Sequence, residues 1–179
     1  MSLLRCRPLC GAAGVVAAVC VGLSMVSMAQ ASGGPCEAPV EARILHLRSA
    51  LNGKEVECDL PALTRLPTRE IVTTLPEALG MPGKQRWQGV SLRLLAEQMG
   101  GDSGQVLQLV ALNDYTVTVP WSDLVQYDPI VAYRRNGHTM RVRDKGPLVL
   151  IYPFGSHPAL DSQQYTNRTI WQIHAITLK

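Results

Sequence analysis

The sequence predicts a β-rich domain in which a few short helices separate a series of strands. Three observations favour it. Over residues 116–119 two valines alternate with two threonines, the period of a strand buried on one face. The dipeptide Asn136-Gly137 separates strand-like residues 130–133 and 139–142, and it suits a type I′ turn because both central residues need positive φ. Residues 147–152 form a nearly continuous apolar run, which is typical of a strand inside a sheet.

The first part of the domain is expected to start with a hairpin. Residues 44–47 and 54–58 are strand-like, and Asn52-Gly53 can turn the chain between them. Residues 69–75 contain four consecutive β-branched residues and predict a further strand. Residues 79–86, which contain Gly, Pro and Lys, are expected to form a loop.

Three short helices are expected, each after a polar residue that can cap its first turn. Asp59 precedes a brief helix with Pro61 near its start. Ser91 precedes apolar residues at helical spacing that end at Gly100-Gly101, and Ser122 is placed to cap a helical turn after Pro120. The remaining strands are expected at residues 105–112 and 169–178.

Residues 1–31 differ from the rest of the chain. Arg5 and Arg7 give a positively charged start, residues 11–28 carry no charge, and Ala29-Gln30-Ala31 matches a small-residue cleavage site. We therefore expect a signal peptide that is cut after Ala31, and the alternative is an uncleaved membrane anchor. A flexible tail is expected over residues 32–43 and the folded domain over 44–179, with no membrane span after cleavage.

The charge balance excludes partners that bind by long-range electrostatic attraction. The whole chain has 17 Lys+Arg and 14 Asp+Glu, and two of the arginines belong to the leader, so the mature chain has a net charge of only +1. Such a balance does not favour nucleic acid or anionic lipid as a partner.

Two cysteines remain after the leader is removed, Cys36 and Cys58. An even pair in an exported domain predicts one disulfide, which would join the tail to the first hairpin. The alternative is a pair of free thiols or metal ligands, but no further His or Cys stands nearby at ligand spacing.

Several short motifs occur together in one order. They are Trp87-Gln88-Gly89-Val90-Ser91-Leu92, Asn113-Asp114-Tyr115, Ala132-Tyr133, Asn136-Gly137, Gly146-Pro147-Leu148, Trp171 and Ile176. This ordered set resembles the molybdopterin-binding domain of the sulfite oxidase family and covers most of residues 44–178. The resemblance implies an α+β fold with mixed sheets and a few short helices, in an exported protein.

The resemblance does not extend to the family's chemistry. In that family a Cys thiolate, a ligand type that suits molybdenum, lies on the loop after the strand that matches residues 69–75. Here residues 74–80 contain no cysteine, and none follows Cys58. The family also holds the pterin phosphate with a His before and an Arg after its "G-x-P-L" segment, where this chain has Lys145 and Val149. We therefore expect no catalytic residue, no metal ligand and no cofactor, with weak molybdopterin binding through Lys145 as the alternative.

Basic residues gather around the predicted hairpin and form the candidate ligand site. They are Arg134, His138, Arg141, Arg143 and Lys145, together with Arg135. If residues 139–142 continue as a strand, Arg141 and Arg143 share one face and could bind a carboxylate, sulfate or phosphate. The alternative is a solvated, charged strand edge, which protects sheets against aggregation.

Two other constellations are weaker. Ser156, His157 and Asp161 include the residue types of a hydrolase triad, but they lie in one short loop without a G-x-S-x-G elbow, which favours a local turn. The four histidines are scattered without i, i+4 pairing, so a histidine metal site has little support.

Two function classes follow from the sequence. The first is a periplasmic or secreted binding module that presents a small anion, or itself, to a membrane-associated partner. The second is a molybdopterin-dependent oxidoreductase with an unusual ligand set.

Expression of the full-length chain in a secreting bacterial host should yield a mature protein that begins at Ser32. The charged start and the Ala-Gln-Ala ending are the features that signal peptidase requires. Intact mass and N-terminal sequencing measure this. Recovery of the full-length chain from the membrane fraction would contradict it and indicate an anchor.

Overall fold

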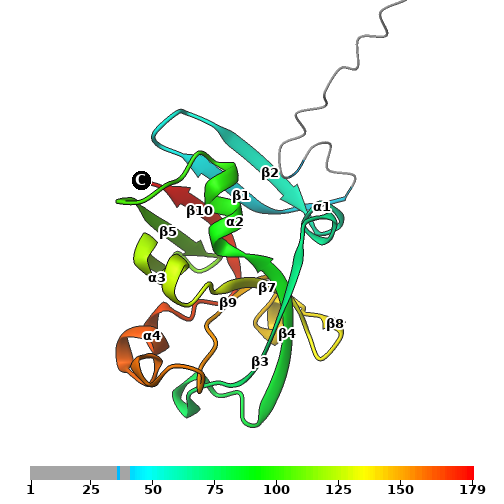
Figure 1. The fold of residues 1–179 in the computed structure, drawn as a ribbon. Coiled ribbons are helices and arrows are strands. Elements are labelled where there is room, and N and C mark those ends of the chain that lie inside the picture. Colours follow the sequence, from blue (N-terminus) through cyan, green and yellow to red (C-terminus); the bar gives the residue numbers. More distant parts are fainter. Residues whose placement is uncertain (1–35, 37–40) are drawn as a thin grey trace, which may run out of the picture. The chain divides into compact units, whose positions relative to one another are not determined.

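Two five-stranded sheets form the domain (Figure 1). The structure, a computed structural model, describes Cys36 and residues 41–179. The predicted leader, residues 1–31, and most of the predicted tail lie outside the described residues, so those two expectations stay predictions.

The first sheet is mixed, with the strand order β2-β1-β10-β5-β6. β1 and β10 are parallel, and the other neighbours are antiparallel. Its strands are β1 (Arg43–Ser49), β2 (Glu55–Asp59), β5 (Val106–Ala111), β6 (Thr116–Pro120) and β10 (Ile173–Leu178).

The second sheet is antiparallel and has the order β3-β4-β7-β8, with β9 also paired to β7. Its strands are β3 (Thr68–Thr74), β4 (Lys84–Ser91), β7 (Ile130–Arg135), β8 (His138–Thr139) and β9 (Val149–Ile151). The α+β class and the mixed sheet agree with the expectation from the sequence.

Seven short helical segments connect these strands. The α-helices are α1 (Leu60–Arg65), α2 (Leu92–Gln98), α3 (Trp121–Gln126) and α4 (Gln163–Arg168). The 3₁₀ helices are η1 (Glu77–Leu79), η2 (Val142–Asp144) and η3 (Pro158–Leu160). Among the described residues, no helix is both long and apolar enough to span a bilayer.

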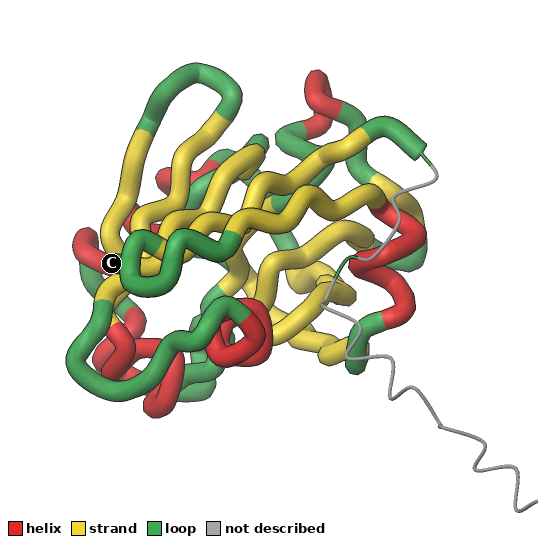
Figure 2. Tube along the Cα trace, turned by 90° about the horizontal axis from the view of Figure 1, so that it is seen from above, coloured by secondary structure: helices red, strands yellow, loops and turns green. Residues whose placement is uncertain are grey.

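One apolar core joins the two sheets. Leu45, Leu107 and Leu109 come from the first sheet and Trp87 and Ile130 from the second, and all are almost fully buried in one cluster. Figure 2 shows the strands, in yellow, running through the middle with helical segments, in red, around them. Burial of large apolar side chains of this kind is the main driving force of folding.

Helix starts follow local capping chemistry in two of the three expected cases. The Asp59 carboxylate accepts a hydrogen bond from the Ala62 amide at 2.8 Å, and Ser91 Oγ accepts one from the Leu94 amide at 3.2 Å. The expectation for Ser122 is wrong. Pro120 is the residue that precedes α3, no side chain caps that helix, and Ser122 lies inside its first turn.

The strand β4 was not anticipated, because residues 79–86 were expected to be a loop. Its side chains Arg86 and Gln88 are polar, while Trp87 between them is fully buried, so the apolar signal is carried by few residues. Gly89 also weakens the strand signal. It is required here because an added Cβ would collide with the Val131 carbonyl oxygen of the neighbouring strand, where the register shifts.

The return strand after Asn136-Gly137 is shorter than expected. β8 ends at Thr139, and the chain then turns on itself, with the amides of Asp144 and Gly146 both donating to the Arg141 carbonyl at 2.9 Å. Arg141 and Arg143 therefore do not share a strand face. The backbone groups that a ladder would pair are satisfied in this turn instead.

The C-terminal strand also begins later than expected, at Ile173 rather than residue 169. Trp171 forms only an isolated bridge with Val149. The helix α4 just before it was not anticipated, because its sequence is polar and carries no apolar period.

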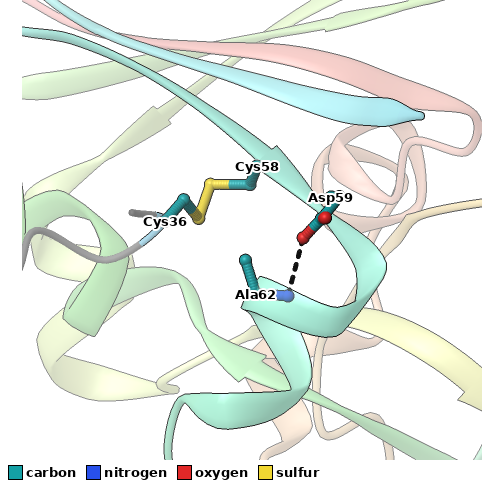
Figure 3. Close-up of a disulfide and its surroundings, with 4 residues drawn as sticks. All are labelled: Cys36, Cys58, Asp59 and Ala62. Atoms are coloured by element: carbon teal, nitrogen blue, oxygen red, sulfur yellow. Dashed lines mark hydrogen bonds between the residues drawn. A yellow bond between two sulfur atoms is a disulfide. The ribbon is translucent and has the colours of Figure 1, made fainter. Parts of the chain in front are cut away.

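The predicted disulfide is present. Cys36 and Cys58 are joined with their Cα atoms 4.9 Å apart, and both are buried (Figure 3). The bond holds Cys36 against the end of β2, next to the Asp59 cap of α1.

Reduction of this disulfide should lower the free energy of unfolding by about 3 kcal/mol, because the open chain regains the entropy that closing a loop of this length removes. Urea denaturation with and without reductant measures the difference. The double variant Cys36→Ala/Cys58→Ala should unfold at the midpoint of the reduced wild type and should not respond to reductant. Equal midpoints for oxidised and reduced wild type would contradict this.

Candidate cleft beside the β3–β4 loop

Two adjoining hollows lie beside the segment that connects β3 to β4. The first has a volume of about 520 Å³ and the second about 330 Å³, and Ala78, Gln163 and Thr166 line both. We call the two hollows together the cleft. Thr74, Glu77, Phe154, Asp161 and Ser162 also line the first hollow. Asn113, Tyr115, Asn167, Thr169 and Trp171 also line the second.

The β3–β4 segment is fixed by apolar anchors at both ends. Leu75 and Leu79 are buried, while Glu77 and Ala78 between them are exposed and border the cleft. Gly80 follows with a φ of 64°, a conformation that glycine adopts without strain, and ends η1. The segment therefore presents its middle residues to the cleft while its ends belong to the core.

The opposite wall is α4, which a buried ion pair fixes to α3. Arg168 Nη1 donates to Asp123 Oδ2 at 2.7 Å, and the Tyr152 hydroxyl donates to the same oxygen at 2.9 Å. The side chain of Asp123 is 5% exposed and that of Arg168 is 20% exposed. In such surroundings the pair is weakly screened, and its partners satisfy each other's polar groups. α3 and α4 lie next to each other in Figure 1.

Tyrosines surround this ion pair. Tyr165 packs edge-on against Tyr127 and Tyr152, with ring centroids 5.3 and 5.4 Å away. Burial, together with a hydrogen bond to Tyr127, raises the pKa of Tyr165 to about 12. Burial and the neighbouring Asp123 carboxylate also raise the pKa of Tyr152. Both hydroxyls therefore stay protonated at any ordinary pH, which leaves Tyr152 available as a donor to Asp123.

The cleft carries negative and neutral polar groups. Among the described residues, no Lys, Arg or His lines either hollow. The Glu77 and Asp161 carboxylates line the first hollow, and both residues are exposed. The lining therefore favours ligands that do not bring further negative charge.

The Lys145 side chain contacts the β3–β4 segment and does not line the cleft. Its ammonium donates to the Leu79 carbonyl at 2.6 Å and stacks on Trp171, 3.8 Å from the ring centroid. Burial, and then the charge of Arg135, lower the pKa of Lys145. This lysine is thus engaged with the backbone and the indole.

The other predicted ligand-binding residues occupy separate elements. Arg134 is exposed, with its guanidinium 5.9 Å from the Tyr133 ring, and His138 is exposed in β8. Arg141 is exposed after β8, and Arg143 lies in η2 with its Nε 3.8 Å from Asp144. The strand face that was expected to align Arg141 with Arg143 is absent. The anion site itself stays a prediction.

The remaining constellations have structural explanations. Ser156 and His157 lie in the loop between β9 and η3, where the Ser156 amide donates to the Pro153 carbonyl at 3.1 Å and His157 packs against Tyr127. Over the described part of the chain, no group of three His, Cys, Asp or Glu residues could hold a metal ion.

Comparison with known protein families identifies the family of this chain. The model of the family "oxidoreductase molybdopterin binding domain" matches residues 31–156, well over half of the chain. The chain belongs to this family. No curated protein sequence matches it.

A solved structure supports the same fold. The crystal structure of the sulfane dehydrogenase SoxCD from Paracoccus pantotrophus is similar, with a TM-score of 0.54 and 19% sequence identity. The similarity covers 75% of this chain but only 37% of the SoxCD chain. The family match ends at residue 156, so α4, one wall of the cleft, lies outside the matched residues.

The lining of the cleft does not fit the cofactor that the family name implies. The loop expected from the sequence resemblance to carry the molybdenum ligand has a carboxylate, Glu77, and no thiolate. Both described cysteines, Cys36 and Cys58, are joined to each other and buried. Val149, at the position of the expected phosphate-binding Arg, is fully buried in β9. Two carboxylates beside a phosphate would repel it.

Few features of the sequence predicted the cleft. Its residues come from segments around positions 74–78, 113–115, 154–155 and 161–171, and no spacing motif links them. Asn113, Tyr115 and Trp171 belong to the ordered set of short motifs, and Asp161 belongs to the weak Ser-His-Asp constellation. The Asp123–Arg168 contact, which places α4, joins residues 45 positions apart.

The substitution Asp123→Asn should lower the free energy of unfolding by about 3 kcal/mol, because it removes the counter-ion of the partly buried Arg168 guanidinium. Urea denaturation measures the loss. Glu97→Gln, which breaks the exposed pair Arg93–Glu97, is the matched control and should cost about 0.5 kcal/mol or less. Equal losses for the two variants would show that the Asp123 pair does not hold the fold.

Proposed function

We propose that the protein is an exported binding module of the oxidoreductase molybdopterin binding domain family, and that it does not perform molybdenum chemistry. In this proposal the cleft receives a small ligand, and the domain presents that ligand, or itself, to a membrane-associated partner. The observation that carries the proposal is the lining of the cleft, which retains a ligand-sized space beside the loop of the family's metal ligand without the donors that the metal requires.

The donors that molybdenum requires support the proposal that the protein performs no molybdenum chemistry. Molybdenum in this family needs a soft thiolate donor, and a metal site is specified by the identity and number of its ligands. Glu77 and Ala78 occupy the exposed part of the loop, and neither can supply sulfur. Recruitment of Cys58 would require reduction of a buried disulfide and rearrangement of β2.

The charges support it as well. A phosphate tail needs donors or cations, and Lys145 is the one basic residue near the second hollow that the sequence suggested for this role. Its ammonium is already engaged with the Leu79 carbonyl and the Trp171 ring. Moving it into the cleft would break both contacts. A lost hydrogen bond to a charged group costs about 1.5–3 kcal/mol, which is one to two decades of affinity.

The proposed export rests on the sequence of residues 1–31 and on the disulfide. A disulfide between Cys36 and Cys58 persists in oxidising compartments, and reduced conditions of the cytoplasm would oppose it. A periplasmic or secreted location would therefore suit this chain.

The alternative function is a molybdopterin-dependent oxidoreductase with an unusual ligand set. The family match over residues 31–156 is the observation in its favour. In that case a carboxylate such as Glu77 would have to replace the thiolate.

Metal and pterin analysis decides between the two. The protein is produced with its leader in a host that makes molybdopterin, purified from the periplasm, and measured by elemental analysis and by fluorescence of the oxidised pterin. We expect both contents to be far below stoichiometric. A family member whose loop carries the cysteine, produced in the same host, shows that the cofactor was available. Near-stoichiometric molybdenum and pterin in this protein would establish the oxidoreductase and end the binding-module proposal.

A further inference from the structure

We infer that the cleft binds a polyhydroxylated ligand without negative charge, a saccharide in chemical class. This rests on the proposed function, because a bound pterin would fill the same space. Three properties of the lining carry the inference: most of its hydroxyl donors are already used, the amides and carboxylates suit hydroxyl partners, and two aromatic rings border the second hollow.

Three of the five hydroxyl groups that line the cleft donate hydrogen bonds to backbone carbonyls. Tyr115 donates to the Asn167 carbonyl at 3.1 Å, Thr166 to Ser162 at 3.1 Å, and Thr169 to Tyr165 at 3.0 Å. Each hydroxyl oxygen keeps lone pairs that can accept. A ligand must therefore bring its own donors to these oxygens. Phosphate, sulfate and carboxylate ligands bring only acceptors, so these positions disfavour them.

The amides and carboxylates complete the match. Gln163, which lines both hollows, uses one N–H on the Asn167 side-chain oxygen at 2.7 Å and keeps its own oxygen and its second N–H. Glu77 and Asp161 add charged acceptors in the first hollow. A sugar hydroxyl both donates and accepts, so it can pair with the amides and form charge-assisted hydrogen bonds with the carboxylates.

The aromatic groups provide an apolar surface for the other face of such a ligand. Trp171 and Tyr115 line the second hollow, and Tyr115 is about half exposed. The Lys145 ammonium covers one face of the indole, so the opposite face and the edge are what remains for a ligand. The C–H faces of sugar rings pack on aromatic rings, which combine an apolar face with polar surroundings.

The size of the cleft agrees with this class. Hollows of about 520 and 330 Å³ lie in the range in which proteins bind small molecules. The shared residues Gln163 and Thr166 place the two hollows side by side, so a ligand of more than one ring could reach both.

Titration of the purified protein with maltotriose, cellotriose and triacetylchitotriose tests the inference, with Trp fluorescence and calorimetry as readouts. We expect at least one of the three to bind saturably. Trp87 is fully buried and Trp121 does not line the cleft, so Trp171→Phe should remove the fluorescence change. Gln163→Leu and Asp161→Asn should each weaken binding about tenfold, because each removes a hydrogen-bonding partner from the ligand.

Asp102→Asn is the matched control, because Asp102 is exposed, lies outside the cleft and accepts from Gln105 in a loop. It should bind the trisaccharide as the wild type does. Circular dichroism confirms that each variant is folded.

Three outcomes overturn the inference. They are no saturable binding of any trisaccharide by folded protein, saturable binding of spermidine but of no saccharide, and displacement of the saccharide by pyrophosphate at comparable concentration. The proposed function fails separately, by the presence of molybdenum and pterin. Cofactor-free protein that binds no saccharide would refute only the ligand class.

Discussion

The buried contact between Asp123 and Arg168 fixes one wall of the cleft. It places α4 against α3, and Tyr152 from the end of β9 donates to the same carboxylate oxygen. Without this three-way contact we expect the six-residue polar helix α4 to be unstable, since short helices are marginal on their own. One wall of the cleft therefore depends on the tertiary contact of Arg168 with Asp123 more than on the helix propensity of α4.

The other wall depends on the core in a different way. Leu75 and Leu79 are buried on either side of Glu77, and the Lys145 ammonium donates a hydrogen bond to the Leu79 carbonyl. The family match includes the strands that carry this loop, whereas α4 lies beyond the matched residues. A fold kept by its core can thus border a space whose chemistry is free to vary, because exposed lining residues contribute little to packing.

Local signals were readable in the sequence and distant ones were not. The Asn52-Gly53 hairpin, the Asp59 and Ser91 caps and the cysteine pair each depend on residues that are close together or few in number, and all are present. The cap expected at Ser122 failed because α3 begins at Trp121, directly after Pro120, two residues before a helix capped by Ser122 would begin.

The larger misses have tertiary causes. β4 is a strand because β3 and β7 pair with its two edges, although its exposed face is polar and Gly89 interrupts it. The grouping of Arg141 with Arg143 assumed a strand that the turn around Gly146 replaces, where an added Cβ would collide with the Met140 carbonyl oxygen. The cleft combines side chains from distant segments of the chain. The charge of its lining could therefore be read only from the folded structure.

The disulfide also sets a mechanical limit on whatever precedes the domain. Cys36 is fastened to the end of β2, and only five residue steps separate it from Ala31. Even a fully extended chain covers no more than about 18 Å over five steps. If the leader stays in a bilayer instead of being cleaved, this short connecting segment would keep the end of β2 close to the lipid surface. The domain would then stay in a thin layer at the membrane surface. Its effective concentration near a membrane-embedded partner would be high there.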